Sequence, residues 1–589
     1  MPLMGSLYIG ASGLQTSQNA LNTTAHNLSN IDTTGYTRQQ VQLSDRSYQT
    51  LSIDIKSVNN KQTGQGVLYS RVKQVRDYFL DKTYRKESGR SMFYEISTEV
   101  LEEVESQLGE MNGEAFQTSI TDFWTSVQEL AKDPSSSVTQ GLLVQRASEF
   151  VERATAVYEG LSSYQDNLNT QIKQQVDKIN EYGQQILALN DSIRSIEVGG
   201  VENANDLRDV RNQILDELSQ LADITYGEDL YGNVYVRIEG EDFVKGGTCY
   251  EIGLDVDATT GFYTPFWPQN ATYIEEADGT RRYNIEGAEV FNLNREISSD
   301  MNTDIGGLKA MLLARGDHRA DYTDMDEAVY DKVSQSVVMN IQAEFDQLIH
   351  NVVTKINDIL ANAAGLESGN LTLKDGTTLE NVRYCKSDAE GYLRDTDGKP
   401  IRLFTKATTD GYQKVTVSEE KLDANGNGTG LYEDVEYWVF NEEVVGQTDS
   451  LYTISNLEIN QDLMQRPAML GFRLKDGSED IATAEALKAA FTEENYTLNP
   501  NVKKRTTFVD YYTDLVSQIA NSGSVYRSIY TNQEGTVESV QSAREQVVGV
   551  SSDEELSNMI KLQNAYNASS RYINVISEML EHIINALAI

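Results

Sequence analysis

The chain has 589 residues, 39% of them hydrophobic, and a formal net charge of -41. This length allows several domains of roughly 100 to 200 residues, each with a buried core. The acidic excess argues against a protein that binds nucleic acid or anionic lipid, and we expect a solvated acidic surface or, as the alternative, calcium binding.

A heptad pattern over the first thirty residues predicts an amphipathic helix. Its leucines recur every seven positions, and mostly small residues lie three positions before each of them: Leu7, Leu14, Leu21 and Leu28. Three glycines, Gly5, Gly10 and Gly13, each weaken the helix by up to about 1 kcal/mol relative to alanine. We expect this helix to be marginal or disordered alone in water, and therefore to need a partner helix.

The sequence NLSNIDTTGYTR ends this helix and turns the chain. Asn30 is suited to a helix C-cap, and Gly35 to a backbone with positive φ. The predicted turn residues are Asn27, Asn30, Asp32, Gly35, Tyr36 and Arg38. Residues 39–80 that follow alternate in polarity and are predicted to be extended or irregular.

The clearest predicted helix covers residues 138–198. Two apolar rows continue for about eight heptads without a proline, and Gly199 and Gly200 end them. Such a helix spans roughly 90 Å, which a globular enzyme rarely needs. Further helices are predicted at 91–131, ending before Pro134, and at 204–222.

The sequence pattern changes from helical to β-like in the middle of the chain. Residues 224–298 alternate in polarity and contain turn signals, which predict a β domain. Residues 305–364 are predicted to be helical, with a break near GDHRADYTD. Residues 367–500 again carry β-like patterns, with Asp-Gly and Asn-Gly turns.

The last ninety residues are predicted to be helical. Ser551 or Ser552 can cap the final helix, and acidic residues fill its first turn. Its predicted seam consists of Met559, Leu562, Tyr566, Ile573, Ile576, Leu580 and Ile583. We expect these positions to pack against the leucines of the first helix, either of the same chain or of a neighbouring copy.

These elements predict an α+β multidomain fold. A long coiled-coil-like helical rod is built from both termini, which meet at one end, and β-rich domains are inserted in the middle of the chain and lie at the other end. The predicted divisions are 1–60, 61–223, 224–304, 305–365, 366–500, 501–550 and 551–589. The first and last are the terminal helices, and 224–304 and 366–500 are the β-rich parts.

The sequence offers little catalytic chemistry. Its four histidines stand in no zinc-protease pattern, and nucleophile-elbow, phosphate-loop and dinucleotide-binding motifs are absent. The two cysteines, Cys249 and Cys385, exclude a disulfide framework or thiolate cluster, although a single bridge between them is the alternative. We therefore expect no enzyme and no cofactor, and we also expect neither a cleavable signal peptide nor a membrane-spanning helix.

One segment resembles a calcium loop. Positions 1, 3, 5 and 12 of such a loop would be Asp423, Asn425, Asn427 and Asp434. Asp434 is one carbon shorter than the usual glutamate, and no helix is predicted before it. An Asn-Gly-rich hairpin turn explains the segment equally simply.

Both ends of the chain resemble one family of proteins. GASGLQTSQNALNTTAHNLSNIDTTGYTRQ is similar to the amino-terminal signature of flagellar rod, hook and hook-associated proteins. VSSDEELSNMIKLQNAYNASSRYINVISEMLEHIINAL is similar to their carboxy-terminal helix. The arginine of GYTRQ, the long helical stretch 91–222 and the acidic start of SSDEELSNMIKLQNAY favour the FlgK family within this group.

The resemblance implies a structural subunit of the flagellum. Such a chain is exported unfolded through the type III apparatus and lies outside the cell at the hook–filament junction. It assembles into a homo-oligomeric ring or short tube through its terminal helices. Its implied partners are hook protein on one side, hook-associated protein 3 on the other, and an export chaperone, with no nucleic acid and no membrane insertion.

Two alternatives stay open. One is a hook or distal rod subunit of the same machine, which a single long helix over 138–198 would disfavour because hook proteins turn to β structure early. The other is a secreted coiled-coil surface protein in which the β insertion at 366–500 is active.

Overall fold

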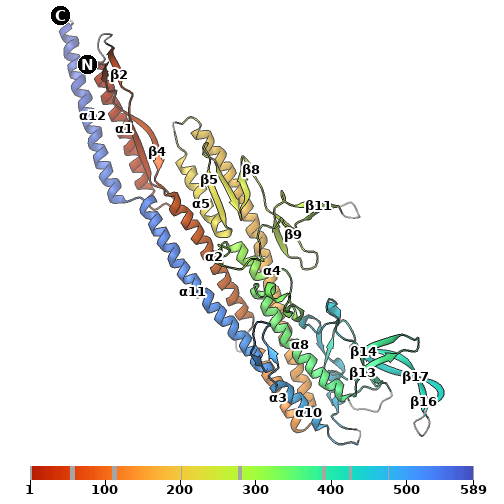
Figure 1. The fold of residues 1–589 in the computed structure, drawn as a ribbon. Coiled ribbons are helices and arrows are strands. Elements are labelled where there is room, and N and C mark those ends of the chain that lie inside the picture. Colours follow the sequence, from red (N-terminus) through yellow and green to blue (C-terminus); the bar gives the residue numbers. More distant parts are fainter. Residues whose placement is uncertain are drawn as a thin grey trace.

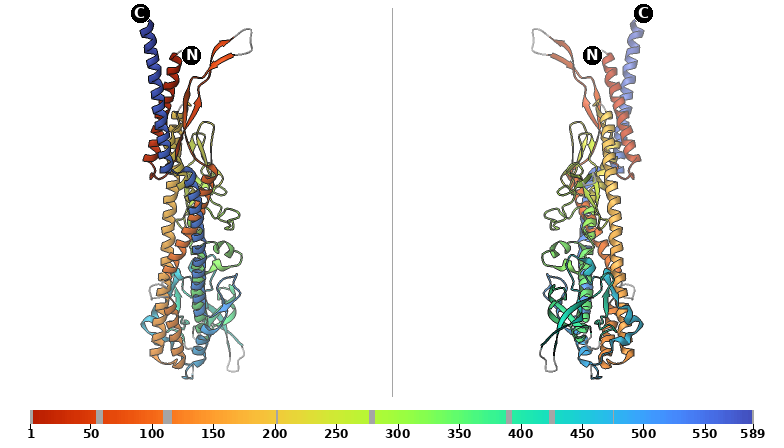
Figure 2. Two further views of the ribbon diagram at one scale, coloured as in Figure 1. Left: turned by 90° about the vertical axis from the view of Figure 1, so that its left-hand side faces the viewer. Right: turned by 90° about the vertical axis from the view of Figure 1, so that its right-hand side faces the viewer.

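Long helices lying side by side give the molecule the shape of a rod (Figure 1). The computed structural model describes residues 3–53, 60–108, 116–200, 202–275, 281–387, 393–422, 428–474 and 476–587. Both termini lie at the same end of the rod (Figures 1 and 2). The predicted α+β class, with helices from both termini forming the rod, is confirmed.

Helix α4 (Ser137–Glu197) has 61 residues and corresponds to a length of roughly 90 Å. Its buried residues recur at intervals of three and four, as the heptad pattern predicts, from Leu143 to Ile193. Gly200, with φ of +64°, follows the end of the helix. The predicted range of 138–198 agrees with this helix to one residue at each end.

Helices α2 (Tyr78–Gln107) and α11 (Phe508–Val548) pair in antiparallel directions along the rod. Asp77 caps α2 by accepting hydrogen bonds from the N–H groups of Phe79 and Leu80. The helix predicted at 91–131 is therefore wrong in extent, because α2 starts at Tyr78 and a separate helix, α3 (Phe116–Lys132), follows it.

The terminal helices α1 (Leu3–Ser29) and α12 (Ser552–Leu587) form a second antiparallel pair beyond this one. Two antiparallel ribbons follow α1 and lean away from it (Figure 2). They are formed by β1 (Gln39–Asp45) with β4 (Val67–Gln74), and by β2 (Gln49–Ile53) with β3 (Asn60–Thr63). We call the level at which these elements meet α2 and α11 the waist.

Helix α5 (Asn205–Leu221) leads into the first β region, as predicted. A four-stranded antiparallel sheet lies against α4: β5 (Ile224–Glu228), β6 (Val234–Ile238), β7 (Glu241–Lys245) and β8 (Thr248–Cys249). Two hairpins follow: β9 (Gly253–Val256) with β10 (Tyr263–Phe266), and β11 (Thr272–Glu275) with β12 (Arg281–Asn284). Since this sheet lies beside the upper part of α4, the expectation that β structure gathers at the far end alone is wrong (Figure 1).

The chain then returns to helices with the predicted break. The helices are α6 (Gly307–Arg315), the 3-10 turn η2 (Tyr322–Met325), α7 (Tyr330–Val333) and α8 (Val337–Ala363). Asp321 caps η2, and its carboxylate accepts a hydrogen bond from Thr323 N–H.

The second β region has a small core of its own. Its sheet has the order β13 (Glu367–Thr372), β14 (Thr378–Lys386), β17 (Gly428–Phe440), β16 (Tyr412–Leu422). The buried members of this core are Leu371, Val417, Tyr437 and Val439. Shorter strands accompany the sheet: β15 (Phe404–Lys406) with β18 (Leu457–Ile459), and β19 (Tyr496–Thr497) with β20 (Arg505–Thr506).

The prediction of β structure throughout 367–500 is wrong in part. Helices α9 (Gln461–Gln465) and α10 (Ile481–Thr492) lie between β18 and β19. Three 3-10 turns occur in the predicted β range as well, two before β18 and one after it: Thr448–Ser450, Ile454–Asn456 and Pro467–Leu470. Helix α10 contacts α3, and the rings of Phe491 and Trp124 stack with centroids 5.1 Å apart.

Aromatic rings bind the far end of the rod into one core. Phe116 of α3 meets Phe345 of α8 and Tyr512 of α11, with ring centroids 4.9 and 5.0 Å apart. Cys249 and Cys385 are free, so the alternative of a bridge between them is excluded. Among the described residues, every helix is too short or too polar to cross a membrane.

Candidate assembly interface

The α1–α12 pair is the structural feature that the terminal heptads predicted, but its contact face on α1 differs from the expectation. The most buried residues of α1 are small: Ser6, Gly10, Ser12, Thr16, Ser17, Ala20, Thr24 and Asn27. Some of them face the β1–β4 ribbon and not α12, since Ser12 Oγ accepts a hydrogen bond from Val67 N–H at 3.3 Å. A Cβ atom on Gly10 would lie 2.7 Å from Cγ1 of Ile573, and one on Gly13 would lie 2.9 Å from Oγ of Ser569. Small residues therefore let the two helix backbones approach closely.

The structure places the predicted seam residues beside this face. Leu7, Leu14, Leu21 and Leu28 are half-buried along α1. On α12, Met559, Leu562, Tyr566, Ile573 and Leu580 are half-buried and Ile576 is buried, which is the pattern expected of positions that face α1. Ile583 is different, because it is 41% exposed near the end of the helix.

A second apolar stripe runs along α12 at the edge of this contact, and one of its members, Tyr572, also reaches α1, since a Cβ atom on Gly10 would lie 3.1 Å from Cδ1 of Tyr572. It consists of Tyr572, Val575, Met579 and Ile583, spaced by three, four and four residues, so the four side chains lie on one flank of the helix. They are 42%, 47%, 50% and 41% exposed. We call these four residues the α12 stripe. A row of large apolar side chains left in water is typical of a surface that another protein covers.

Asn27 holds the turn that follows α1. Its Oδ1 accepts hydrogen bonds from the Tyr36 hydroxyl at 2.7 Å and from Gln39 N–H at 3.0 Å, and its Nδ2 donates to Gln39 O at 2.8 Å. Because Asn27 is only 1% exposed, all three bonds are shielded from water. Gly35 has the predicted positive φ, +79°.

The other predicted turn residues have varied roles. Asn30 donates its backbone N–H and its Nδ2 to His26 O, at 3.2 and 3.0 Å, so it closes the end of α1. The ring of Tyr36 stacks on His26, and burial followed by the nearby Asp209 raises the pKa of its hydroxyl, so the hydroxyl stays a donor. Asp32 is exposed and lines a groove between the turn, α5 and the end of α11.

Arg38 joins this turn to the start of α12. Its backbone N–H donates to Val548 O at 2.9 Å, at the end of α11. Its Nε donates to Oε1 of Glu555 at 3.0 Å, and its Nη1 lies 3.0 Å from Oε2 of Glu554. One residue near the N-terminus thus fixes the break between α11 and α12 and also satisfies the buried carboxylate of Glu555.

A network of charged groups lies directly below this break. We call it the waist network: Arg76, Asp81, Arg85, Asp216 and Arg544. Arg76 binds both oxygens of Asp81 at 2.9 Å, and Arg544 bridges Asp81 at 2.8 Å to Asp216 at 2.6 Å. Burial alone would raise the pKa of Asp81, but the hydrogen bond and charge of Arg76, with Arg544 and Arg85, lower it.

Asp209 of α5 connects the turn to this network. It accepts a hydrogen bond from Thr37 N–H at 3.2 Å and another from Gln74 Nε2 at 2.8 Å. Burial raises the pKa of Asp209 to about 6, despite the hydrogen bonds from Thr37 that lower it. The sequence reasoning missed Asp209 and the waist network, because apart from the pair Arg76–Asp81 the partners are more than a hundred residues apart and no local spacing marks them.

The candidate calcium loop stays a prediction. Asp423, Asn425 and Asn427 lie outside the described residues, whereas Asp434 lies in β17 and pairs with Lys374, Nζ to Oδ2, at 2.5 Å. Among the described residues, no group of three or more His, Cys, Asp or Glu side chains is arranged to hold a metal ion.

Arg38→Gln should loosen the first turns of α12. The change removes both ion pairs and leaves the buried Glu555 carboxylate without its cation, which should cost about 1 to 2 kcal/mol locally. Amide hydrogen exchange at the start of α12 should then be about tenfold faster. Arg527→Gln, which breaks an exposed pair with Glu102 in the middle of α11, is the control. Unchanged exchange in Arg38→Gln would show that the ion pairs of Arg38 with Glu554 and Glu555 do not stabilise the start of α12.

Family models match three successive parts of the chain. The helical domain of flagellar hook-associated protein FlgK matches residues 101–374, the flagella basal body rod protein model matches 7–37, and the C-terminal model of basal body rod proteins matches 543–586. Flagellar hook-associated protein 1 of Bacillus subtilis is 23% identical over 98% of this chain and 97% of its own length. Over nearly its whole length the chain is therefore similar to the FlgK family.

Other members of the family align equally completely. The hook-associated protein 1 of Escherichia coli is 23% identical over 99% of this chain and all of its own length, and that of Salmonella typhimurium is 24% identical over 98% of both chains. The structure of the hook junction protein FlgK from Burkholderia pseudomallei covers 79% of this chain at 13% identity, with a TM-score of 0.49. The two terminal matches cover most of α1 and its turn, and Arg544 with nearly all of α12.

Proposed function

We propose that this chain is a structural subunit that forms the hook–filament junction of the bacterial flagellum. It assembles side by side with copies of itself into a ring or short tube, through α1 and α12, and has no enzymatic activity. Hook protein contacts the ring on one side and hook-associated protein 3 on the other. The chain acts outside the cell, after export with the help of a chaperone.

The α12 stripe is the observation that carries this proposal. The side of α12 that faces α1 is occupied within the chain, so the stripe is left for a neighbour. A helix with one apolar row toward its own partner and a second row toward solvent is suited to a closed wall of helices, in which every helix has two neighbours.

Two further observations support the proposal. The resemblance implies one long helix in this range for the FlgK family and none for hook proteins, so the 61-residue α4 disfavours the hook subunit alternative. The small residues on the buried face of α1 bury little apolar area, and such a helix is weak without its partner, which suits a chain that is exported unfolded.

The double variant Val575→Asp, Met579→Asp tests the proposal. Both side chains are about half exposed, so the monomer should keep its stability, whereas two charges inside an assembled wall should abolish assembly onto purified hooks. Electron microscopy of hook tips and sedimentation of the free protein measure the two effects. Asn574→Asp, which adds a charge to an exposed position next to the stripe, is the control and should assemble.

Full assembly by the double variant would contradict a ring built through α12. Loss of assembly together with a lower melting temperature of the monomer would show instead that the stripe belongs to the fold of the single chain.

A further inference from the structure

A positively charged groove lies on one flank of the waist, in a chain with 90 acidic and only 49 basic residues. It consists of two adjoining hollows that share Arg85 and Tyr226 in their walls, and β4, α2, α5 and β5 line it. Eight arginine or lysine side chains and only three carboxylates line the two hollows together. We call this feature the basic groove.

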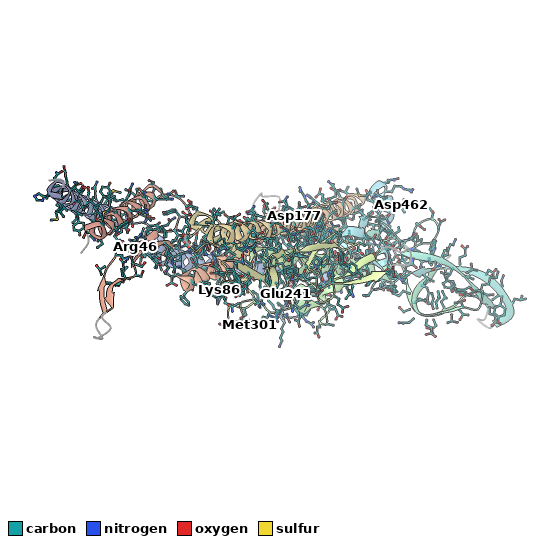
Figure 3. All side chains as sticks on the ribbon, turned by 90° about the horizontal axis from the view of Figure 1, so that it is seen from above. Arg46, Lys86, Asp177, Glu241, Met301 and Asp462 are labelled. Atoms are coloured by element: carbon teal, nitrogen blue, oxygen red, sulfur yellow. The ribbon has the colours of Figure 1, made fainter. Side chains whose placement is uncertain are left out.

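Four of its cations are exposed at its rim. Arg71 and Lys73 come from β4, and Lys82 and Lys86 come from successive turns of α2. Within the part of the chain that the structure describes, none of these four forms an ion pair, whereas Arg208 deeper in the groove pairs with Glu197 and Glu228. Figure 3 shows Lys86 on the same side of the molecule as Glu241 and Met301, away from Asp177. The groove therefore presents a net positive charge to its surroundings.

The opposite flank of the waist carries the complementary charge. Glu534, Glu538 and Glu545 of α11 are spaced by four and seven residues, so they lie on one side of the helix, and all three are exposed. They too form no ion pair with any described residue. Helix α11 lies on the other side of α2 from the β5–β8 sheet and the groove (Figure 1). We call these three residues the acidic stripe.

The acidic stripe has further carboxylates as neighbours on α2. Burial, followed by the neighbouring carboxylates of Glu99 and Glu534, raises the pKa of Glu95 on the adjacent α2. Like charges gathered in this way repel one another, and cations brought from outside the chain would relieve the repulsion.

We propose that the basic groove of one subunit receives the acidic stripe of a second copy of this chain. The two surfaces are different and lie on opposite flanks at the same level of the rod, which is the arrangement of a heterologous contact that repeats around a ring. This contact rests on the proposed function, and it adds an electrostatic contact at the waist to the apolar one along α12. Opposite charge at this level fixes which flanks meet and the height at which neighbours align.

A charge exchange in the full-length chain tests the contact. The groove variant is Lys82→Glu, Lys86→Glu, and the stripe variant is Glu534→Lys, Glu538→Lys. Each should self-associate about tenfold more weakly than the wild type in sedimentation velocity, because like charges then face each other. The fourfold variant that carries both changes should recover association, and so should an equimolar mixture of the two double variants.

Lys503→Glu, Arg505→Glu is the matched control, since it changes net charge as much as the groove variant but lies beside the start of α11, far along the chain from the groove. It should associate as the wild type does. Unchanged melting curves for all variants exclude misfolding as the cause. Wild-type association should also weaken at high salt, as an exposed charge contact requires.

The outcomes separate this contact from the proposed function. If the wild type assembles and both double variants assemble as well as the control, the contact at the groove is wrong and assembly through α12 stands. If the wild type stays monomeric on hooks and in solution, the proposed function is wrong and the contact falls with it. Calorimetric binding of inorganic phosphate that Lys82→Glu, Lys86→Glu abolishes, without any change in association, would overturn the contact in favour of a small-anion site.

Discussion

Gly89→Ala should destabilise the chain by about 3 kcal/mol or more, whereas Gly141→Ala should stabilise it by up to about 1 kcal/mol. Both glycines lie inside long helices, α2 and α4. The same substitution therefore changes helix propensity equally at both sites, and only the surroundings differ.

The surroundings of Gly89 leave no room for a methyl group. A Cβ atom there would lie 2.4 Å from the backbone oxygen of Ser219 in α5 and 2.9 Å from Cγ2 of Ile305. The backbone N–H of Gly306 also donates to Gly89 O at 3.0 Å, so three segments converge on this position. At Gly141 nothing lies within 4 Å of the added atom. The methyl group at position 89 must push backbone away, which is costly in a packed core.

Urea denaturation of both variants, followed by circular dichroism, measures the two effects. A common sign for the two changes would contradict the close contact between α2 and α5. Gly89→Ser should behave like Gly89→Ala, since its Cβ meets the same two atoms.

The free energy of unfolding should fall as pH rises from about 5 to about 8, and Glu344→Gln should remove part of this fall. Glu344 of α8 is fully buried. Its oxygens accept hydrogen bonds from Asn499 Nδ2 at 2.8 Å and from Gln518 Nε2 at 3.1 Å. Burial raises the pKa of Glu344 from 4.5 to about 7, despite these hydrogen bonds.

The direction in which the free energy of unfolding changes with pH follows from proton binding. Because the folded pKa exceeds the unfolded one, the folded state holds a proton that the unfolded state has lost between about pH 4.5 and 7. The stabilising contribution is complete below about 4.5 and is lost as pH rises through about 7, a change of roughly 3 kcal/mol. Burial raises three further pKa values in the same direction, to about 6, 7 and 8, at Asp209, Glu239 and Asp346.

Denaturation of the wild type and Glu344→Gln at a series of pH values measures this contribution. The uncharged glutamine should leave stability nearly unchanged at pH 5 and increase it above pH 7. Glu152→Gln, at an exposed position of α4, is the control and should give a curve parallel to that of the wild type. Parallel curves for Glu344→Gln as well would mean that this carboxyl does not titrate between pH 5 and 8.

Local periodicity explains what the sequence could predict. Helices α4 and α5 agree with the ranges 138–198 and 204–222 to one residue at each end, because apolar spacing and terminal glycine or β signals define them. In the candidate interface, Gly35 was predicted correctly because positive φ favours glycine at one position of a turn.

Short helices within a β-rich range were harder to predict from the sequence. Helix α10 lies within the range predicted to be β, although Ala484, Leu487 and Phe491 are spaced by three and four residues and are all buried. The Asp-Gly turn at 476 and the strands before it favoured β structure over this brief pattern. The signal was present, but twelve residues of it were outweighed by their neighbours.

No pattern in the sequence predicted the contacts between distant charged residues. Asp81 and Arg544 stand 463 positions apart, and neither differs in sequence context from a solvated surface charge. The acidic first turn of α12 was read correctly as a helix start, yet nothing local connects Glu555 to Arg38. Only the meeting of the two chain ends at the waist makes these partners visible.

The clamp of Arg38 on Glu555 closes a loop of 517 residues. Loops of this length close late, because entropy opposes the encounter until the intervening structure has brought the ends together. The terminal helix that is free first, α1 or α12, stays unpaired until the other is available. The α1–α12 pair therefore cannot form before both helices are free, whichever of them is synthesised or delivered first.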